Sequence, residues 1–473
     1  MLPFINREDE LKRLRTMYQS DRPELVIVYG RRRMGKTRLI IESIKGFEDI
    51  VYHQAIQGTT EQQMESFIQD ASETFPGVDQ IRKDWANILL FLVKKDAIVI
   101  IDEFPYFVKE SKELPSVIQR IWDHEVHASS TTFVLTGSSI GMIHDIAING
   151  GAPLYGRVSK RPNGRLNIGP LSFSHAMKFF PNYDPIEQVM AYGVYGGTPE
   201  YLRAIDTSIS LRENIQENLL RSDGALHEEP ENVLHRELKE VDRYFSILKA
   251  MAEGCTTVNE IGQAAGVTTG SEGFYLDRLM DLRIVRRSYP VTVDPARSRK
   301  GRYHIQDPLF RFWFRFIFGR SSRYEVYGEG AYEDLIEPHL PDFVSPCFEE
   351  LCQRALLQAY KDEHKFLEMP GNWWDNRGNE IDIVAPTSGK TMLIGEVKFQ
   401  NKPMDYGVLA RLEDKVSLLD WSPRVGKPNY GYVLFSRSGF SASLCDAAEE
   451  RDDLRLFDMR DVVFFLSGGS GLN

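Results

Sequence analysis

The sequence of 473 residues lacks the features of a membrane or secreted protein. No hydrophobic run approaches the ~18 residues that a membrane helix needs, and the opening MLPFINREDELKRL contains no apolar core of a secretory signal. Its four cysteines form no CxxC pair, which indicates reduced, buried thiols rather than disulfides. We therefore expect a cytoplasmic protein that does not contact a membrane.

The sequence also lacks an excess of positive charge. Its formal net charge is −11, so the whole chain does not attract nucleic acid by bulk electrostatics. Any contact with nucleic acid must come from local basic patches.

The pattern of hydrophobic residues predicts an α/β protein with several domains. Short β-branched runs such as ELVIVY, AIVII and TTFVL alternate with amphipathic helical stretches up to about residue 170, which indicates a parallel sheet covered on both faces. The next segment has helical patterns, and the one after it predicts three helices and a hairpin. A Gly/Ser-rich charged stretch follows, and the last part predicts a helix and then strands. We expect a P-loop core over 1–170, a helical lid over 171–238, a winged helix over 239–320, a linker over 321–340 and a last α/β domain over 341–473.

A phosphate-binding loop follows the first strand. Residues 30–37, GRRRMGKT, match GxxxxGK[ST] between an apolar strand and the helix KTRLIIESI. The backbone N–H groups and the helix N-terminus favour phosphate, Lys36 reaches the β- and γ-phosphates, and Thr37 ligates Mg²⁺. The predicted ATP-binding residues are Gly30, Arg31, Arg32, Arg33, Met34, Gly35, Lys36, Thr37 and Arg38, together with Asp102.

Two carboxylates end a later strand. AIVII is followed by Asp102 and Glu103, at the edge where an α/β sheet binds its ligands. We expect Asp102 to hold Mg²⁺ and Glu103 to act as the general base that polarises the attacking water. Both features together predict ATP binding with Mg²⁺, and hydrolysis.

Two further features have two interpretations each. Thr136 or Ser138, at the end of the next strand, senses the γ-phosphate, or this segment only provides a simple helix N-cap at Ser138 or Ser139. Arg157 either supplies a cation to the transition state or is a surface arginine. If Arg157 acts on a neighbouring subunit, the protein is a homo-oligomer.

The chain resembles the archaeal-type ATPase family, a branch of the AAA/STAND P-loop superfamily. The resemblance rests on FINREDEL (4–11), YGRRRMGKT (29–37), VIIDEFPY (99–106), LTGSSIGMI (135–143), PLYGR (153–157) and YGGTPEYL (195–202), and it extends to about residue 320. It implies a RecA/AAA-like core, a helical lid and a winged helix. It also implies that ATP acts as a conformational switch, with Gly197 and Pro199 where the lid meets the nucleotide.

The predicted winged helix carries a basic tip. YFSILKAMAEG, TVNEIGQAAGV and SEGFYLDRLMDLRIVRR predict three helices, and the hairpin that follows carries Arg297, Arg299, Lys300 and Arg302. A basic wing beside a helix-turn-helix is typical of phosphate contact with DNA. The alternative is a module that packs against the ATPase core and leaves this tip solvated.

Acidic residues and a lysine are spaced for a metal site near the C-terminus. Asp382 precedes Glu396 by fourteen residues, which fits adjacent strands, and Glu396 and Lys398 share one face of the second strand. We expect Mg²⁺ on Asp382 and Glu396, with Lys398 orienting a water or stabilising charge on a phosphodiester.

This arrangement resembles the PD-(D/E)xK nuclease superfamily, and WWDNRGNEIDIVAP…GEVKF resembles the nuclease-like domain that often follows archaeal-type ATPases. By that likeness Glu349 is the carboxylate of the preceding helix, with Glu350 as the alternative. The alternative interpretation is a metal-free fold in which Glu396 and Lys398 only form an ion pair.

The sequence predicts an ATP-hydrolysing P-loop ATPase coupled to a Mg²⁺-dependent DNA nuclease. One alternative is a STAND-type switch whose C-terminal domain binds a partner without catalysis. Another is a regulator that binds DNA through the winged helix.

Overall fold

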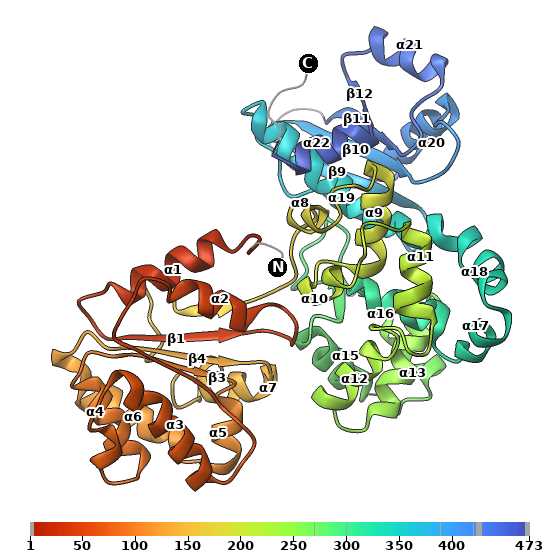
Figure 1. The fold of residues 1–473 in the computed structure, drawn as a ribbon. Helices are drawn as coiled ribbons and strands as arrows, with labels where there is room; N and C mark the ends of the chain where they lie inside the picture. Colours follow the sequence, from red (N-terminus) through yellow and green to blue (C-terminus); the bar gives the residue numbers. More distant parts are fainter. Residues whose placement is uncertain are drawn as a thin grey trace. The chain divides into compact units, whose positions relative to one another are not determined.

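A parallel sheet of five strands forms the centre of the first of two units (Figure 1). The computed structural model describes residues 4–268, 270–298, 300–387, 389–419, 421 and 428–468. The first unit contains residues 1–170 and 198–200, and the second contains 171–197 and 201–473.

The strand order of the first sheet is β2-β3-β4-β1-β5, and each adjacent pair is parallel. Its strands are β1 (Glu24–Tyr29), β2 (Ile50–Gln54), β3 (Ile98–Asp102), β4 (Thr132–Gly137) and β5 (Arg165–Asn167). The helices of this unit are α1 (Glu8–Tyr18), α2 (Lys36–Ser43), α3 (Thr60–Thr74), α4 (Trp85–Val93), α5 (Pro105–Glu110), α6 (Leu114–His124) and α7 (Ile140–Ile143), with short turns at Val78–Gln80, Val126–Ala128 and His144–Ile148.

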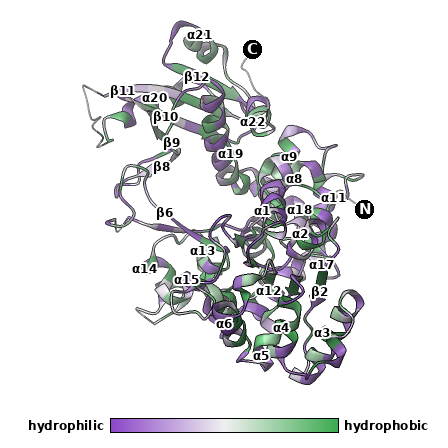
Figure 2. Cartoon of the chain, turned by 90° about the vertical axis from the view of Figure 1, so that its left-hand side faces the viewer, coloured by the Kyte–Doolittle hydropathy of each residue, from purple (hydrophilic) through white to green (hydrophobic). Residues whose placement is uncertain are grey.

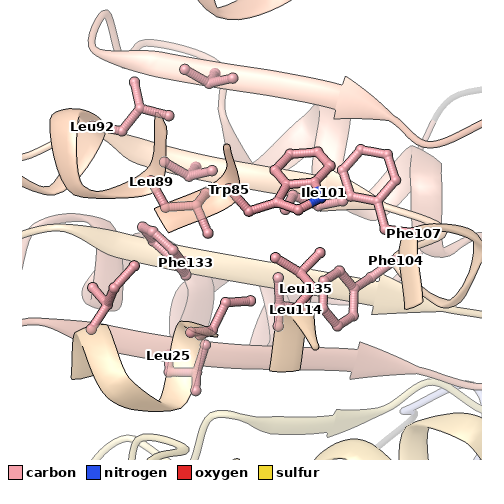
Figure 3. Packing of buried hydrophobic residues seen from close by; sticks show 14 of the residues in the cluster. Leu25, Trp85, Leu89, Leu92, Ile101, Phe104, Phe107, Leu114, Phe133 and Leu135 are labelled. Carbon is pink, nitrogen blue, oxygen red and sulfur yellow. The ribbon is translucent and has the colours of Figure 1, made fainter. Parts of the chain in front are cut away.

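Both faces of this sheet are buried. Along β1, Leu25 and Ile27 belong to one hydrophobic cluster, whereas Val26 and Val28 belong to another. The first cluster includes Trp85, Phe107 and Phe133 and appears in Figure 3. Since successive side chains of a strand point to opposite faces, a strand buried on both sides is continuously apolar. The predicted parallel sheet between two helical layers is confirmed.

The second unit begins with helices and a hairpin. Its helices up to the hairpin are α8 (Phe173–Ala176), α9 (Pro185–Tyr195), α11 (Leu211–Ile215), α12 (Glu229–Glu237), α13 (Val241–Ala252), α14 (Val258–Ala265) and α15 (Glu272–Asp281), with turns at Met177–Phe179 and Gln216–Leu220, while α10 (Pro199–Arg203) begins within the first unit. The antiparallel strands β6 (Val285–Ser288) and β7 (Arg302–Ile305) follow. The expected three helices and hairpin are therefore present as α13, α14, α15 and β6–β7.

The segment 321–340, predicted to be a linker, is helical instead. It follows α16 (Pro308–Phe312) and the turn Trp313–Ile317, and forms α17 (Ser321–Tyr327), α18 (Glu329–Leu335) and the turn Glu337–His339. Tyr324, Tyr332 and Ile336 are buried, and the Tyr324 hydroxyl donates to the Phe316 carbonyl at 2.8 Å. The linker prediction failed because glycine, serine and charge dominate the composition while a few apolar residues determine the packing.

The C-terminal part of the second unit is a mixed sheet with the order β12-β11-β10-β9-β8. Strands β8, β9 and β10 are antiparallel neighbours, whereas β10, β11 and β12 run parallel. The elements are α19 (Leu340–Asp362), β8 (Gly371–Trp374), β9 (Glu380–Pro386), β10 (Thr391–Lys398), α20 (Tyr406–Val416), β11 (Asn429–Ser436), α21 (Ala442–Glu450), β12 (Leu454–Asp458) and α22 (Met459–Leu466).

The long helix α19 is amphipathic. Hydrophilic and hydrophobic residues both occur along it (Figure 2), and Val344, Phe348, Leu351 and Ala355 on its buried side recur at helical spacing. This burial places one side of α19 against the rest of the unit and leaves Glu349 and Glu350 at its margin.

The four cysteines are free thiols. Cys347 and Cys352 are buried as predicted, but Cys445 is exposed and Cys255 is half-buried. Across the part of the chain that the structure describes, no helix is both long enough and apolar enough to span a membrane.

Candidate functional site

The loop between β1 and α2 depends on two glycines. Gly30 has φ +149°, and a Cβ there would lie 2.2 Å from the Ile168 carbonyl oxygen. Gly35 has φ +83° and immediately precedes the first residue of α2. Only glycine combines this close approach with these backbone angles. The loop consequently turns tightly at the N-terminus of α2, where backbone N–H groups and the helix dipole favour a phosphate.

Lys36 is held over this loop. Its side chain is buried, and Nζ donates to the carbonyl oxygens of Gly30 at 2.8 Å and Arg31 at 3.2 Å. The ammonium group therefore lies beside the backbone that is predicted to surround the β- and γ-phosphates.

The two predicted magnesium ligands of the first unit come together. Thr37 on α2 donates its hydroxyl to Asp102 Oδ2 at 2.7 Å, although the two residues are 65 positions apart in the chain. Asp102 is fully buried. Its other oxygen accepts from the Thr136 hydroxyl, and the Tyr52 hydroxyl donates to Oδ2 at 3.2 Å. A hydroxyl and a carboxylate oxygen are the hard ligands that Mg²⁺ prefers, so the pair fits that ion.

Glu103 has a strained backbone and a fixed side chain. Its φ is +56°, which is uncommon for any residue other than glycine. Ser138 donates both its backbone N–H (3.1 Å) and its hydroxyl (2.9 Å) to Glu103 Oε2. The N-cap of α7 is Ser139, which makes no side-chain capping bond. The hydroxyl of Ser138 therefore orients Glu103, a role that sequence reasoning did not assign to it.

The remaining loop residues differ in their surroundings. Arg31 is buried and donates to the Thr198 hydroxyl at 3.4 Å, Arg32 donates to the Tyr106 hydroxyl at 2.6 Å, and Met34 is buried in the core. Arg33 is exposed and Arg38 is half-buried.

Thr198 and Pro199, although distant in sequence, belong to the first unit and lie beside the loop. The Pro199 Cγ lies 3.9 Å from the position of a Cβ on Gly35. This places Pro199 at the phosphate-binding loop, whereas the carbonyl of Gly197 accepts the backbone N–H of Leu171 at 2.7 Å.

Sequence reasoning also missed Tyr52 and Tyr106. The available signal for Tyr52 was its position on β2, where it lies opposite Ile100 of β3, two residues before Asp102. Burial, followed by the charge of Asp102, raises the pKa of Tyr52, so the hydroxyl stays protonated and donates to the carboxylate. The partner of Tyr106 could not be predicted because Arg32 is 74 positions away.

Arg157 is engaged by a neighbouring acid. Its Nε and Nη2 donate to the two oxygens of Asp123 on α6 at 2.9 and 2.7 Å. The hydrogen bond from Arg157 lowers the pKa of Asp123. This bidentate pair gives the arginine a structural partner within its own chain.

The predicted acidic residues of the C-terminal domain lie on adjacent strands. Gly395 on β10 is paired with Ile383 on β9, so the antiparallel register places Glu396 opposite Asp382. Asp382 Oδ2 accepts the backbone N–H of Val397 at 2.9 Å. Burial, and then the charge of Glu396, raises the pKa of Asp382 to about 6.

Glu396 is paired with two lysines. Lys398 Nζ lies 2.7 Å from Oε1, and Lys415 Nζ, from α20, lies 3.3 Å from Oε2. Burial opposes the charge of Lys398, but Glu396 and the neighbouring acids outweigh it and raise the pKa of that lysine. Lys415 also donates to the Glu380 carbonyl at 2.7 Å. The sequence offered Lys415 only as a neighbouring cation, not as a partner of Glu396.

Glu349 approaches the same cluster from α19. Burial, and then the charge of Asp382, raises the pKa of Glu349 to about 8. Glu350 instead pairs with Arg286 at 2.5 Å, so Glu349 is the helix carboxylate beside Asp382. Among the described residues no three acidic, histidine or cysteine side chains form a ready metal-binding group. We call Glu349, Asp382, Glu396, Lys398 and Lys415 the acidic cluster.

The hairpin that was predicted to carry a basic tip contacts the C-terminal domain. Arg302 pairs with Glu380 and lies over the Trp374 ring at 4.8 Å. The Val291 N–H donates to the Asn372 carbonyl at 3.0 Å. Arg297 and Lys300 are exposed, and Arg299 lies outside the described residues. Arg302 is thus held within the protein rather than presented at a free tip.

Comparison with known proteins identifies the family of the first unit. Residues 4–205 match a family described as an ATPase domain predominantly from Archaea. Over 466 residues the chain is 33% identical to Uncharacterized protein MJECL04 of Methanocaldococcus jannaschii, covering 97% of this chain and 99% of that one. The chain belongs to the archaeal-type ATPase family. The predicted ATP-binding ATPase domain is confirmed at the level of this family.

Other similarities of this archaeal-type ATPase are shorter or weaker. Residues 313–410 match a family of archaeal and bacterial proteins of unknown function. The Uncharacterized ATP-binding protein MJ0423 of the same organism is 49% identical over 37 residues, which are 8% of this chain and 63% of that protein. A chain from the structure of Drosophila ORC bound to DNA aligns with 66% of this chain and 88% of its own, at 14% identity and a TM-score of 0.32, too low to indicate a shared fold.

Proposed function

We propose that this archaeal-type ATPase hydrolyses ATP with Mg²⁺ at the loop between β1 and α2. The hydrogen bond of 2.7 Å between Thr37 and Asp102 carries the proposal. It joins the two expected metal ligands across 65 positions and places them at the end of β3, next to Lys36 on α2. Asp102 is buried, and its hydrogen-bond partners are three hydroxyl groups and the backbone N–H of Glu103, so no cation of the protein balances its charge through these bonds.

Each of the residues around this pair has a separate role in the proposed reaction. Loop N–H groups and Lys36 bind the phosphates and stabilise charge that develops on them. Ser138 holds Glu103 in position, where its carboxylate accepts a proton from the attacking water. Mg²⁺, held by Thr37 and Asp102, would neutralise phosphate charge.

Replacing Asp102 tests this proposal. Phosphate release from ATP would be measured for the wild type with Mg²⁺, the wild type with EDTA, and Asp102→Asn. A matched control is Asp96→Asn, an aspartate that lies just before the opposite end of the same strand. We expect loss of hydrolysis with EDTA and in Asp102→Asn, and activity in the control. Undiminished hydrolysis by Asp102→Asn would refute the site.

A second candidate function is Mg²⁺-dependent cleavage of a nucleic-acid phosphodiester by the acidic cluster. The observation in its favour is that Asp382 and Glu396 directly adjoin the paired residues Ile383 and Gly395 of neighbouring strands, with Lys398 Nζ 2.7 Å from Glu396. Glu349 lies near enough that the charge of Asp382 raises its pKa. Asp382 and Glu396 would hold the metal, which would polarise the phosphodiester. Lys398 would stabilise negative charge on the phosphate.

Cleavage of supercoiled, linear and single-stranded DNA, with Mg²⁺ or Mn²⁺ and with or without ATP, tests the second function. We expect cleavage by the wild type, none by Asp382→Asn, and undiminished cleavage by Asp414→Asn, an exposed acid next to Lys415. Lys36→Ala would show whether ATP controls the reaction.

Two outcomes would favour the alternatives. Intact ATP hydrolysis with no cleavage favours a nucleotide-driven switch whose C-terminal domain is a binding module. Sequence-specific DNA binding that is lost on replacing Arg302 favours a regulator acting through a winged helix.

A further inference from the structure

One face of the hairpin β6–β7 gathers positive charge. Arg286 on β6 is paired with His304 on β7, and Arg302 lies two residues before His304, so the three share a face. Burial, and then the charges of Arg286, Arg302 and Arg311, lowers the pKa of His304 to about 4. His304 is therefore neutral near pH 7, and the positive charge around it comes from Arg286, Arg302 and Arg311.

Two carboxylates offset part of this charge. Glu350 lies 2.5 Å from Arg286, and Glu380 pairs with Arg302. These two ion pairs involve Arg286 and Arg302, and Arg311 takes part in neither. Glu349 also lies near Arg311.

Arg311 has donors with no acceptor. Its Nε and Nη2 are buried and have no hydrogen-bond partner among the described residues, and the same holds for Nε of Arg286. The Arg311 guanidinium lies over the Phe343 ring at 4.6 Å. Arginine does not lose its charge in a protein, and buried charged donors without acceptors are costly and rare. An oxyanion bound at this point would satisfy them.

These arginines border the acidic cluster. Glu350, the partner of Arg286, follows Glu349 on α19, and Glu380, the partner of Arg302, is two residues before Asp382 on β9. An anion on Arg311 would therefore lie close to the carboxylates for which phosphodiester chemistry is proposed above.

We propose that Arg286, Arg302 and Arg311 form a binding site for a phosphate group of a nucleic-acid backbone. The planar guanidinium group donates two parallel hydrogen bonds to phosphate, which lysine cannot do. Contacts to phosphates position a strand without reading its bases, so the site accepts many sequences. The inference rests on the second candidate function, because it supplies the substrate to that cluster.

Fluorescence anisotropy with labelled single-stranded DNA, duplex DNA and RNA of one sequence tests the site at several salt concentrations. All proteins would carry Asp382→Asn, so that cleavage does not interfere. We expect Arg311→Gln to weaken binding at least about fivefold and to reduce the salt slope by about one. Arg286→Gln should act in the same direction, and Arg311→Lys should restore binding only in part, since it keeps the charge but not the fork.

Arg297→Gln is the matched control, because Arg297 lies in the same hairpin loop, is 90% exposed and pairs loosely with Asp294. It should bind as the parent does. Thermal melting would verify that each variant is folded. Parent-like affinity and salt slope in both Arg311→Gln and Arg286→Gln would overturn the site.

The assay separates this inference from the second candidate function. Arginine-dependent binding supports the phosphate site even if the protein with Asp382 intact never cleaves nucleic acid. Cleavage that does not depend on Arg311 would overturn the site and leave that function standing.

Discussion

The negative charge of the carboxylates is compensated differently in the two acidic sites of this protein. In the first unit, the side-chain partners of the buried Asp102 are hydroxyl groups of Thr37, Tyr52 and Thr136. In the second unit, Glu396 is paired with Lys398 and Lys415. Hydroxyl groups donate hydrogen bonds but supply no charge, so the first site gains directly from a bound cation, whereas lysines already balance the second.

This difference indicates how strongly each site depends on a metal ion. A buried carboxylate whose hydrogen-bond partners are neutral is stabilised by an external cation, which under the proposed function would be Mg²⁺ delivered with ATP at Asp102. In the acidic cluster, protons and lysines take that role: burial raises the pKa of both Glu349 and Asp382. A metal ion there must displace protons or ammonium groups, so its binding is weaker at low pH.

The largest expected effect comes from Lys36→Ala. Hydrolysis should fall at least about 100-fold, because the variant loses a cation that stabilises phosphate charge. Phosphate release and the binding of a fluorescent ATP analogue measure it. Lys45→Ala, an exposed lysine just after the same helix, is the control. If Lys36→Ala bound and hydrolysed ATP as the wild type does, the first unit would not contain the proposed ATP site.

Glu103→Gln should separate binding from chemistry. Glutamine can still accept the hydrogen bonds from Ser138 but cannot take up the proton of water, so hydrolysis should fall about 100-fold with ATP affinity retained. Single-turnover kinetics and equilibrium titration provide the two readouts. An equal loss of affinity and rate would mean that Glu103 supports binding rather than catalysis.

The acidic cluster should make stability depend on pH. The folded pKa of Glu349, about 8, is above its ordinary value of 4.5. Its contribution is present below the ordinary pKa and is lost as pH rises towards about 8. Relative to Glu349→Gln, the wild type in EDTA should lose on the order of 2 kcal/mol of unfolding free energy between about pH 5 and about pH 8. Urea unfolding at several pH values measures this, and parallel curves for the two proteins would contradict it.

The smallest effect is expected at Arg157. Because it forms a surface pair with Asp123, Arg157→Ala and Asp123→Ala should each lower the free energy of unfolding by less than about 1 kcal/mol. Hydrolysis should be similar in both. A selective loss of hydrolysis in Arg157→Ala would instead show that the arginine acts on the nucleotide and would add a cation to the first site.

Much of the first site was predictable because its chemistry is local. GRRRMGKT contains the loop, the lysine and the threonine within eight positions, and Asp102 and Glu103 follow a strand directly. The orienting partners were harder to predict. Ser138 belongs to a different strand end from Glu103, and Tyr52 meets Asp102 only because β2 and β3 are neighbours.

For the acidic cluster, the sequence indicated Asp382, Glu396 and Lys398 through strand spacing and resemblance. It did not indicate that Lys415 would pair with Glu396, because that contact depends on how α20 lies on the sheet. Nor did it indicate that Arg302 would pair with Glu380 of the C-terminal domain. Both contacts depend on where long side chains from different elements meet. The hydrophobic periodicity of the sequence does not determine this.

By itself the sequence determined the alternation of strands and helices, the phosphate-binding loop and the positions of the carboxylates, because hydrophobic period and backbone requirements act over a few residues. Only the tertiary structure decided which charges and hydroxyls meet those carboxylates, and that 321–340 folds as helices rather than a linker. Those outcomes depend on packing between distant segments, where a few buried side chains such as Tyr324 and Ile336 outweigh the composition around them.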